Sequence, residues 1–189
     1  MRELSISGNK VPPGQEVRIS ANIAKLPSYT DIDLNITVAR AVEEGPTLLL
    51  SAGLHGDEIN GTEIIRRIIE KGDHVPKKGT VVCIPIINMF GFINFSRYVP
   101  DGKDVNRSFP GNSRGSLAER LADKIFYSIA STHPDLVIDL HNDWNRSIPY
   151  TLVDITDTSD LANQVNQFAQ ATRFPVVFDS DLIENSLAF

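Results

Sequence analysis

Residues 47–61, TLLLSAGLHGDEING, join a short apolar run to a polar turn and to the start of a helical pattern. The run at 47–52 is continuous rather than alternating, which is typical of a strand that is covered on both faces. Similar runs occur at 80–87 and 136–140. Isoleucines at i, i+4 spacing predict a helix over 58–71. The stretch therefore indicates a strand–helix unit of an α/β fold.

Two alternating stretches precede this unit. Apolar and polar residues alternate over 17–23 and again over 32–38. This period of two predicts half-buried strands, which we expect to pair as an antiparallel edge. We therefore expect residues 1–45 to form N-terminal antiparallel edge strands of the same domain as residues 46–189.

Two further helices are indicated in the second half of the chain. Apolar residues from Leu117 to Ile129 form a stripe, and Ser116 with Glu119 is a capping box that marks the start of that helix. A third helix is expected over 159–172, followed by a strand over 175–178. The predicted fold class is α/β, a mixed central sheet with helices on both faces.

Composition excludes several classes of protein. The chain has 189 residues, of which 41% are hydrophobic and 22% charged, so disorder, a collagen-like repeat and a coiled coil are excluded. The net charge of -6 argues against a nucleic-acid partner and gives no reason to expect a membrane partner. The single cysteine, Cys83, and the lack of an apolar leader or membrane-length run suggest a cytoplasmic protein. The oligomeric state is left open.

Two segments depart from the α/β pattern. Residues 88–115 show no convincing periodicity but carry several glycines and aromatic residues, and connections of this length in compact domains are usually functional or disordered. The aromatic residues argue against disorder. The chain also stops at an apolar tail, 186–189, soon after an expected strand. We therefore expect the chain to be truncated at its C-terminus.

Candidate metal ligands follow two of the predicted buried strands. His55 and Glu58 come after the first, and His141 comes directly after the run at 136–140. Ligands bind in open α/β sheets outside the carboxyl ends of the strands, so these side chains can face one crevice. Two histidines and one glutamate are a ligand set of catalytic zinc. Asp139 shares a strand face with His141 and could accept the N–H of a ligand imidazole.

Each of these residues also has a structural interpretation. A histidine after a buried strand is more often a hydrogen-bonded structural group, and Asp139 could be a buried acid that accepts from backbone N–H groups. Asp57 suits a helix N-cap. We expect His74 and His133 to be solvated. The joint occurrence of the candidate ligands favours the metal site over these readings.

The long connection supplies candidate substrate-binding residues. Arginine suits carboxylate binding and oxyanion stabilisation, because its charge is permanent and its donors form a planar fork. The pair Asn106 and Arg107 could clamp a substrate carboxylate. The alternative is a surface loop held by arginine salt bridges.

Three motifs carry a resemblance to a known family. They are GLHGDEING at 53–61, DVNRSFPG at 104–111 and DLHN at 139–142. In this order they resemble the succinylglutamate desuccinylase/aspartoacylase family of the zinc carboxypeptidase superfamily, over roughly residues 45–189. The resemblance implies a zinc-peptidase-like α/β fold. It also implies the site residues: zinc ligands His55, Glu58 and His141, Arg97 to polarise the scissile carbonyl, and Asn106 with Arg107 to hold a substrate carboxylate.

One part of the family's site has no clear counterpart. The resemblance implies a general-base glutamate on a late strand, beyond residue 189, and Glu184 is the only glutamate after His141. We therefore expect a zinc-dependent deacylase of small N-acyl amino acids whose 189 residues alone are nearly inactive. The alternatives are a metallocarboxypeptidase and a non-catalytic zinc-binding domain.

Overall fold

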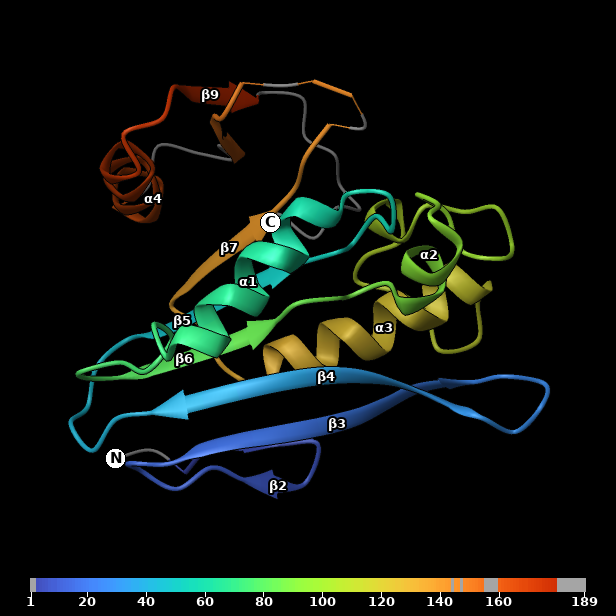
Figure 1. Ribbon diagram of the computed structural model, residues 1–189, viewed down its shortest axis with the longest axis horizontal. Coiled ribbons are helices and arrows are strands. Elements are labelled where there is room, and N and C mark those ends of the chain that lie inside the picture. The colour runs from blue at the N-terminus through green and yellow to red at the C-terminus, as the bar shows by residue number, and fades with distance from the viewer. Residues whose placement is uncertain (1–2, 144, 147, 155–159, 180–189) are drawn as a thin grey trace.

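A five-stranded mixed sheet forms the centre of the folded molecule (Figure 1). The computed structural model describes residues 3–143, 145–146, 148–154 and 160–179. The elements, in chain order, are β1 (Ser5–Ile6), β2 (Asn9–Lys10), β3 (Glu16–Lys25), β4 (Asp31–Arg40), β5 (Thr47–Ala52), α1 (Ile59–Lys71), β6 (Thr80–Ile84), α2 (Met89–Asn94), the 3-10 helix η1 (Val105–Arg107), α3 (Leu117–Ala130), β7 (Leu136–Leu140), β8 (Thr151–Asp154), α4 (Asp160–Ala171) and β9 (Val176–Asp179).

The strand order of the central sheet is β3-β4-β6-β5-β7. β3 pairs with β4 and β4 with β6 in antiparallel register, whereas β5 runs parallel to both β6 and β7. The antiparallel edge expected from the alternating stretches is therefore confirmed, and it continues directly into the parallel strands. β8 and β9 form a separate parallel pair that lies with α4 past the β7 edge of the central sheet (Figure 1).

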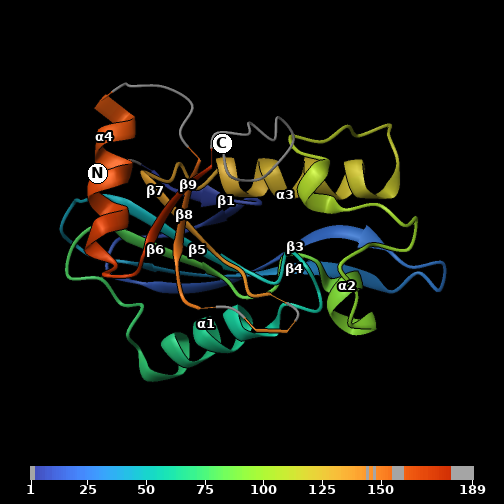
Figure 2. The same ribbon diagram turned by 90° about the horizontal axis from the view of Figure 1, so that it is seen from above.

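Helices cover both faces of the sheet (Figure 2). On one face, Leu121 and Ile125 of α3 are buried in the main core together with apolar residues of β3 and β4. On the other, Ile65 of α1 packs against Ala52 and Cys83. The mixed sheet with helices on both faces is confirmed, and it explains why the parallel strands are continuously apolar.

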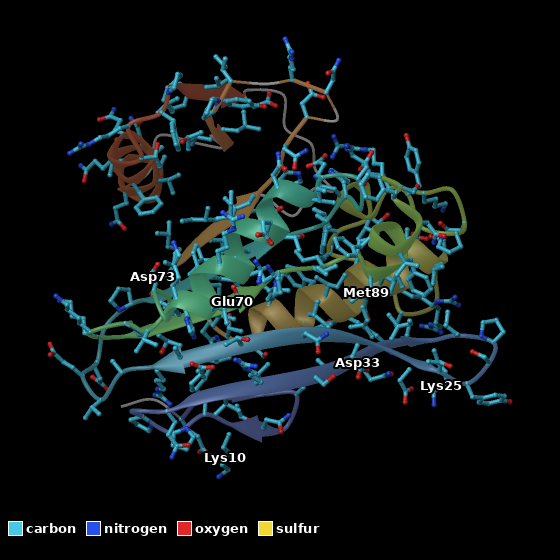
Figure 3. The ribbon with its side chains drawn as sticks, viewed as in Figure 1. Lys10, Lys25, Asp33, Glu70, Asp73 and Met89 are labelled. Atoms are coloured by element: carbon cyan, nitrogen blue, oxygen red, sulfur yellow. The ribbon has the colours of Figure 1, made fainter. Side chains whose placement is uncertain are left out.

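The polar half of the β3–β4 alternation forms an exposed surface. Ser20 Oγ donates to Asp33 Oδ2 at 2.7 Å, and Lys25 Nζ lies 3.1 Å from Asp31 Oδ1. Figure 3 shows Lys25 and Asp33 along this hairpin. The opposite face of each strand supplies the buried residues of the core, as a period of two requires.

The connection 88–115 contains helices that the sequence did not predict. It contains α2 and η1, which begin at side-chain caps: Asn88 accepts from the N–H of Gly91, and Asp104 accepts from the N–H of Asn106. Helices this short have too few turns to show periodicity, which is why the pattern missed them. The expected strand at 80–87 is also shorter, ending at Ile84.

Further expectations concerned two histidines, the C-terminal tail and membrane spans. His74 is not solvated: only 3% of the residue is exposed, and its Nε2 lies 3.1 Å from Glu16 Oε2, a contact that the local sequence could not reveal. His133 is exposed, as expected. Glu184 and the apolar tail at 186–189 lie outside the described residues. Among the residues that are described, no helix combines the length and the apolar character that crossing a membrane requires.

Candidate metal centre

The candidate ligands follow two parallel strands that end at the same edge of the sheet. β5 and β7 are neighbours, with Ser51 opposite Asp139 and Ala52 opposite Leu140. Ser51 Oγ donates to Asp139 Oδ1 at 2.7 Å, which ties the two strand ends together. His141 directly follows β7, and His55 follows β5 after a short turn. Both histidines therefore enter the same region.

Two glycines shape that turn. Gly53 has φ +65°, a left-handed conformation that suits glycine, and its carbonyl accepts from the N–H of Asn88 at 2.8 Å. Gly56 lies directly against α2: a Cβ at this position would stand 1.8 Å from the carbonyl carbon of Gly91. The N–H of Gly56 also donates to the carbonyl of Ser96 at 3.0 Å. The first histidine is thus held between β5 and the start of the long connection.

Glu58 lies between the two imidazoles. Its Oε1 is 2.7 Å from His55 Nδ1, and its Oε2 is 2.8 Å from His141 Nδ1. The main-chain N–H of Asn142 also donates to Oε2, at 3.1 Å. Glu58 occupies the N-cap position of α1, one residue before the helix, and makes no capping hydrogen bond with its side chain. Its carboxylate is therefore available to the site. The N-cap of α1 is thus Glu58 and not Asp57, the residue that suited this position by sequence.

Each imidazole has an aspartate at its other nitrogen. His141 Nε2 is 2.7 Å from Asp139 Oδ2, and His55 Nε2 is 3.3 Å from Asp104 Oδ1. The rings are close, with centroids 5.1 Å apart. His55 is buried, while 37% of the His141 side chain is exposed. Both Nδ1 atoms consequently face Glu58, and both Nε2 atoms face outer carboxylates.

Opposing effects act on the protonation of this cluster. Burial disfavours the ionised form of Glu58, but hydrogen bonds with His141 and His55 hold the pKa of its carboxyl well below the usual range. Burial disfavours the charged form of His141, yet the contacts with Asp139 and Glu58 prevail and raise its pKa to about 10. The same balance of burial against Asp104 and Glu58 raises the pKa of His55. A metal ion that binds these nitrogens has to displace the protons held there.

Arg97 reaches the cluster from the long connection. Its Nη1 lies 3.3 Å from His55 Nδ1 and 3.5 Å from Glu58 Oε1. Its Nε and Nη2 each lie 2.9 Å from Asp104 Oδ2. Burial opposes ionisation of Asp104, but His55 and Arg97 lower its pKa to about 2. The structure thus brings Arg97 to the candidate ligands.

Asn106 and Arg107 lie on η1, just beyond Asp104. The N–H of Asn106 donates to Asp104 Oδ1 at 2.8 Å, so the start of η1 is anchored to a residue that contacts His55. Arg107 is exposed, and its Nη1 donates to the carbonyl of Asn106 at 3.0 Å. This contact orients Arg107 locally, and its role as a substrate clamp stays a prediction.

The cluster fits a divalent metal ion. One donor atom from each of His55, Glu58 and His141 lies within 4.8 Å of the others. Imidazole and carboxylate donors in this ratio suit zinc, and outer carboxylates on the free imidazole nitrogens are the usual support of such ligands. Without a metal, the protons on the two imidazoles and the charge of Arg97 offset the carboxylates of Glu58, Asp104 and Asp139. A divalent cation that displaces these protons supplies the same positive charge.

The sequence interpretation assigned no role to two residues that contact this cluster, Asp104 and Asn142. Asp104 belongs to the quoted motif at 104–111, but its contact with His55 spans 49 residues of sequence. Its position two residues before Asn106 marks it as a helix cap, and no local signal shows the second function. The main-chain N–H of Asn142, which bonds Glu58, leaves no signal in the side-chain pattern.

The mixed sheet and its covering helices define a fold class, the α/β fold of metallocarboxypeptidases. The chain superposes on a metallo-carboxypeptidase from Burkholderia cenocepacia with a TM-score of 0.67 and 11% sequence identity, over 87% of this chain and 49% of that one. Identity this low shows the fold alone.

The match to a protein family is more specific than the shared fold. Residues 44–188 match the succinylglutamate desuccinylase/aspartoacylase catalytic domain, and the chain belongs to this family. It is 32% identical over 135 residues to the N-alpha-acetyl-L-2,4-diaminobutyric acid deacetylase of Halomonas elongata, covering 70% of this chain and 39% of that protein. An aspartoacylase family protein from Mesorhizobium loti superposes with a TM-score of 0.72 and 27% identity, over 88% of this chain and 54% of that one. The chain thus spans about half or less of the length of these relatives.

We expect the Gly56→Ala substitution to weaken both folding and metal binding. The added Cβ overlaps the backbone of Gly91, so α2 and the turn that carries His55 must separate. Overpacking of this kind costs about 1–3 kcal/mol, measurable by urea denaturation. Gly72→Ala is the control, because a Cβ there meets no atom within 4 Å and only the left-handed conformation is strained. Both variants should lose stability, and only Gly56→Ala should lose metal affinity. Equal metal affinities would contradict the expected displacement of His55.

Proposed function

We propose that this chain carries the zinc-binding part of a deacylase that hydrolyses the amide bond of a small N-acyl amino acid. One observation carries the proposal: the Nδ1 atoms of two histidines converge on the Glu58 carboxylate at the carboxyl ends of β5 and β7, with Arg97 beside them. Membership of a family of deacylases supports the reaction class. When bound, zinc supplies Lewis-acid chemistry and lowers the pKa of water.

Arg97 is the proposed stabiliser of the oxyanion. Nη1 is directed at the ligand cluster, while Nε and Nη2 are engaged by Asp104. A donor that is held in place before the reaction stabilises the negative charge that develops on the scissile carbonyl oxygen, without reorganising in the transition state. The permanent charge of the guanidinium suits this role.

Asn106 and Arg107 are the proposed clamp for the substrate carboxylate. They follow Asp104 on η1, and Arg107 is exposed and so accessible to a small anion. A guanidinium can bind a carboxylate with two parallel hydrogen bonds, which fixes the orientation of the substrate as well as its affinity.

We also propose that the general base lies outside the described residues. The carboxylates that contact the cluster in the described ranges are engaged with histidines or Arg97, and the resemblance implies a glutamate on a later strand. General acid–base assistance contributes typically ~10²–10⁴-fold to rate. The resemblance implies that this strand follows residue 189, and on that basis we expect the 189-residue chain alone to turn over substrate slower by about this factor than a protein that includes the strand.

A comparison of substrates tests the proposed function. The protein encoded by the complete reading frame, loaded with zinc, is assayed against N-acetyl and N-succinyl amino acids, N-alpha-acetyl-L-2,4-diaminobutyric acid included, and against unblocked dipeptides. We expect release of the free amino acid from N-acyl substrates and none from dipeptides. Faster cleavage of dipeptides would indicate a metallocarboxypeptidase. Zinc binding without hydrolysis of either class would indicate a non-catalytic zinc-binding domain.

A further inference from the structure

The start of α1 has no cap from its own N-cap residue. Glu58 occupies that position, but its carboxylate oxygens lie against the two imidazoles and make no capping hydrogen bond. The first turn of the helix also contains no acidic residue. A helix begins with N–H groups that have no partner within the helix, so α1 needs an acceptor from another segment.

Asn142 supplies this acceptor from the end of β7. Its Oδ1 accepts from the N–H of Asn60, the second residue of α1, at 3.0 Å and across 82 residues of sequence. Its Nδ2 donates to the carbonyl of Asp143 at 2.9 Å, which agrees with the oxygen of the amide facing the helix. Asparagine is among the residues most favoured as helix caps, and here it acts from a neighbouring strand.

A glycine allows the helix to come this close to the strand. Gly61 is buried, and a Cβ at this position would stand 2.7 Å from both the Cβ and the carbonyl oxygen of Leu140. It would also stand 2.9 Å from the Cβ of Ala52. The first turn of α1 therefore lies directly on the ends of β5 and β7, which brings the side chain of Asn142 within reach of the helix.

The main chain of Asn142 holds Glu58 as well. Its N–H donates to Glu58 Oε2 at 3.1 Å, and the same oxygen lies 2.8 Å from His141 Nδ1. Asn142 thus bonds the side chain of the residue that precedes α1 and a main-chain N–H of the first turn. Because both bonds come from the residue next to His141, they fix the position of Glu58 relative to His141 before a metal binds.

We propose that Asn142 is a positioning residue that caps α1 from β7 and thereby holds Glu58 beside His141. This inference rests on the proposed function, because it assigns Glu58 and His141 to zinc. Loss of the side-chain oxygen leaves the first turn of α1 uncapped, so that only the main-chain N–H still holds Glu58. Partners that orient the ligands of a metal typically contribute ~10–100-fold to its affinity.

Three variants test the proposal. Asn142→Ala removes the accepting oxygen, whereas Asn142→Asp keeps one at the start of the helix, where a carboxylate is favoured. The matched control is Asn112→Ala in the long connection, because Asn112 Oδ1 also accepts from a main-chain N–H, that of Arg114 at 3.0 Å. Zinc affinity is measured by competition with a chelator. Hydrogen exchange of the Asn60 amide in the zinc-free proteins reports the cap itself, which separates it from the attraction of the aspartate charge for zinc.

We expect Asn142→Ala to bind zinc ~10–100-fold more weakly and to exchange the Asn60 amide faster, Asn142→Asp to restore both, and Asn112→Ala to change neither. Wild-type zinc affinity or unchanged Asn60 exchange in Asn142→Ala would overturn the proposal. If this variant does not fold, the wild-type chain still decides, because an Asn60 amide that exchanges as fast as an unprotected peptide contradicts the cap. Failure of the proposed function has a different signature, a wild-type chain with a protected Asn60 amide that binds no zinc at this site.

Discussion

The His141→Ala variant should bind essentially no zinc under conditions in which the wild-type chain binds one equivalent. The substitution removes one of the three donors that lie within 4.8 Å of one another. The loss should exceed the ~10–100-fold that removal of an outer partner typically causes, because a direct ligand is lost. His141 is the better ligand to remove, since 37% of its side chain is exposed, whereas His55 is buried.

The same variant should lose the stabilisation that zinc confers on folding. A metal that binds only the folded chain adds about 2.7 kcal/mol at a concentration of 100 times Kd. Thermal unfolding with and without zinc should show this gain in the wild type and none in His141→Ala. His133→Asn is the control, because it removes an exposed histidine with a left-handed φ of 48°, which asparagine tolerates. Equal zinc content in His141→Ala and the wild type would remove the proposed site.

The convergence of the candidate ligands was predictable from sequence because they follow strands that are themselves easy to recognise. Continuous apolar runs mark β5 and β7, and parallel strands bring their carboxyl ends to one edge. The three candidate ligands therefore had to enter one region if the strands were neighbours. The capping box of Ser116 and Glu119 was equally predictable from sequence, since both of its hydrogen bonds span only three residues.

The parts that sequence missed depend on contacts between distant segments. α2 and η1 each begin at a single side-chain cap, and α2 also packs against the turn at Gly56, features that no periodic pattern records. The burial of His74 depends on Glu16, 58 residues earlier. Asp104 looks like an ordinary cap in its own motif, and only the fold places His55 and Arg97 against its two oxygens.

Replacing Arg97 by alanine should lower kcat by ~10²–10³ in the active, zinc-loaded protein, as removal of an oxyanion donor does. Its Nη1 lies 3.3 Å from His55 Nδ1 without being a metal ligand, so zinc content should be retained. KM should change less than kcat, because the interaction strengthens as charge develops on the carbonyl oxygen. Arg97→Lys should recover little activity, since one ammonium cannot bind Asp104 along an edge and also reach the site.

Zinc content and kinetics of the same preparations separate this role from a structural one. Arg114→Ala, at an exposed position of the same connection, is the control for loss of one positive charge and should retain wild-type kcat. A loss of zinc from Arg97→Ala would mean that Arg97 supports the ligands rather than the substrate carbonyl. A rise in KM at unchanged kcat would assign it to binding of the substrate carboxylate, the role proposed for Asn106 and Arg107. Only a fall in kcat with zinc retained is consistent with stabilisation of the oxyanion, because that interaction is made mainly in the transition state.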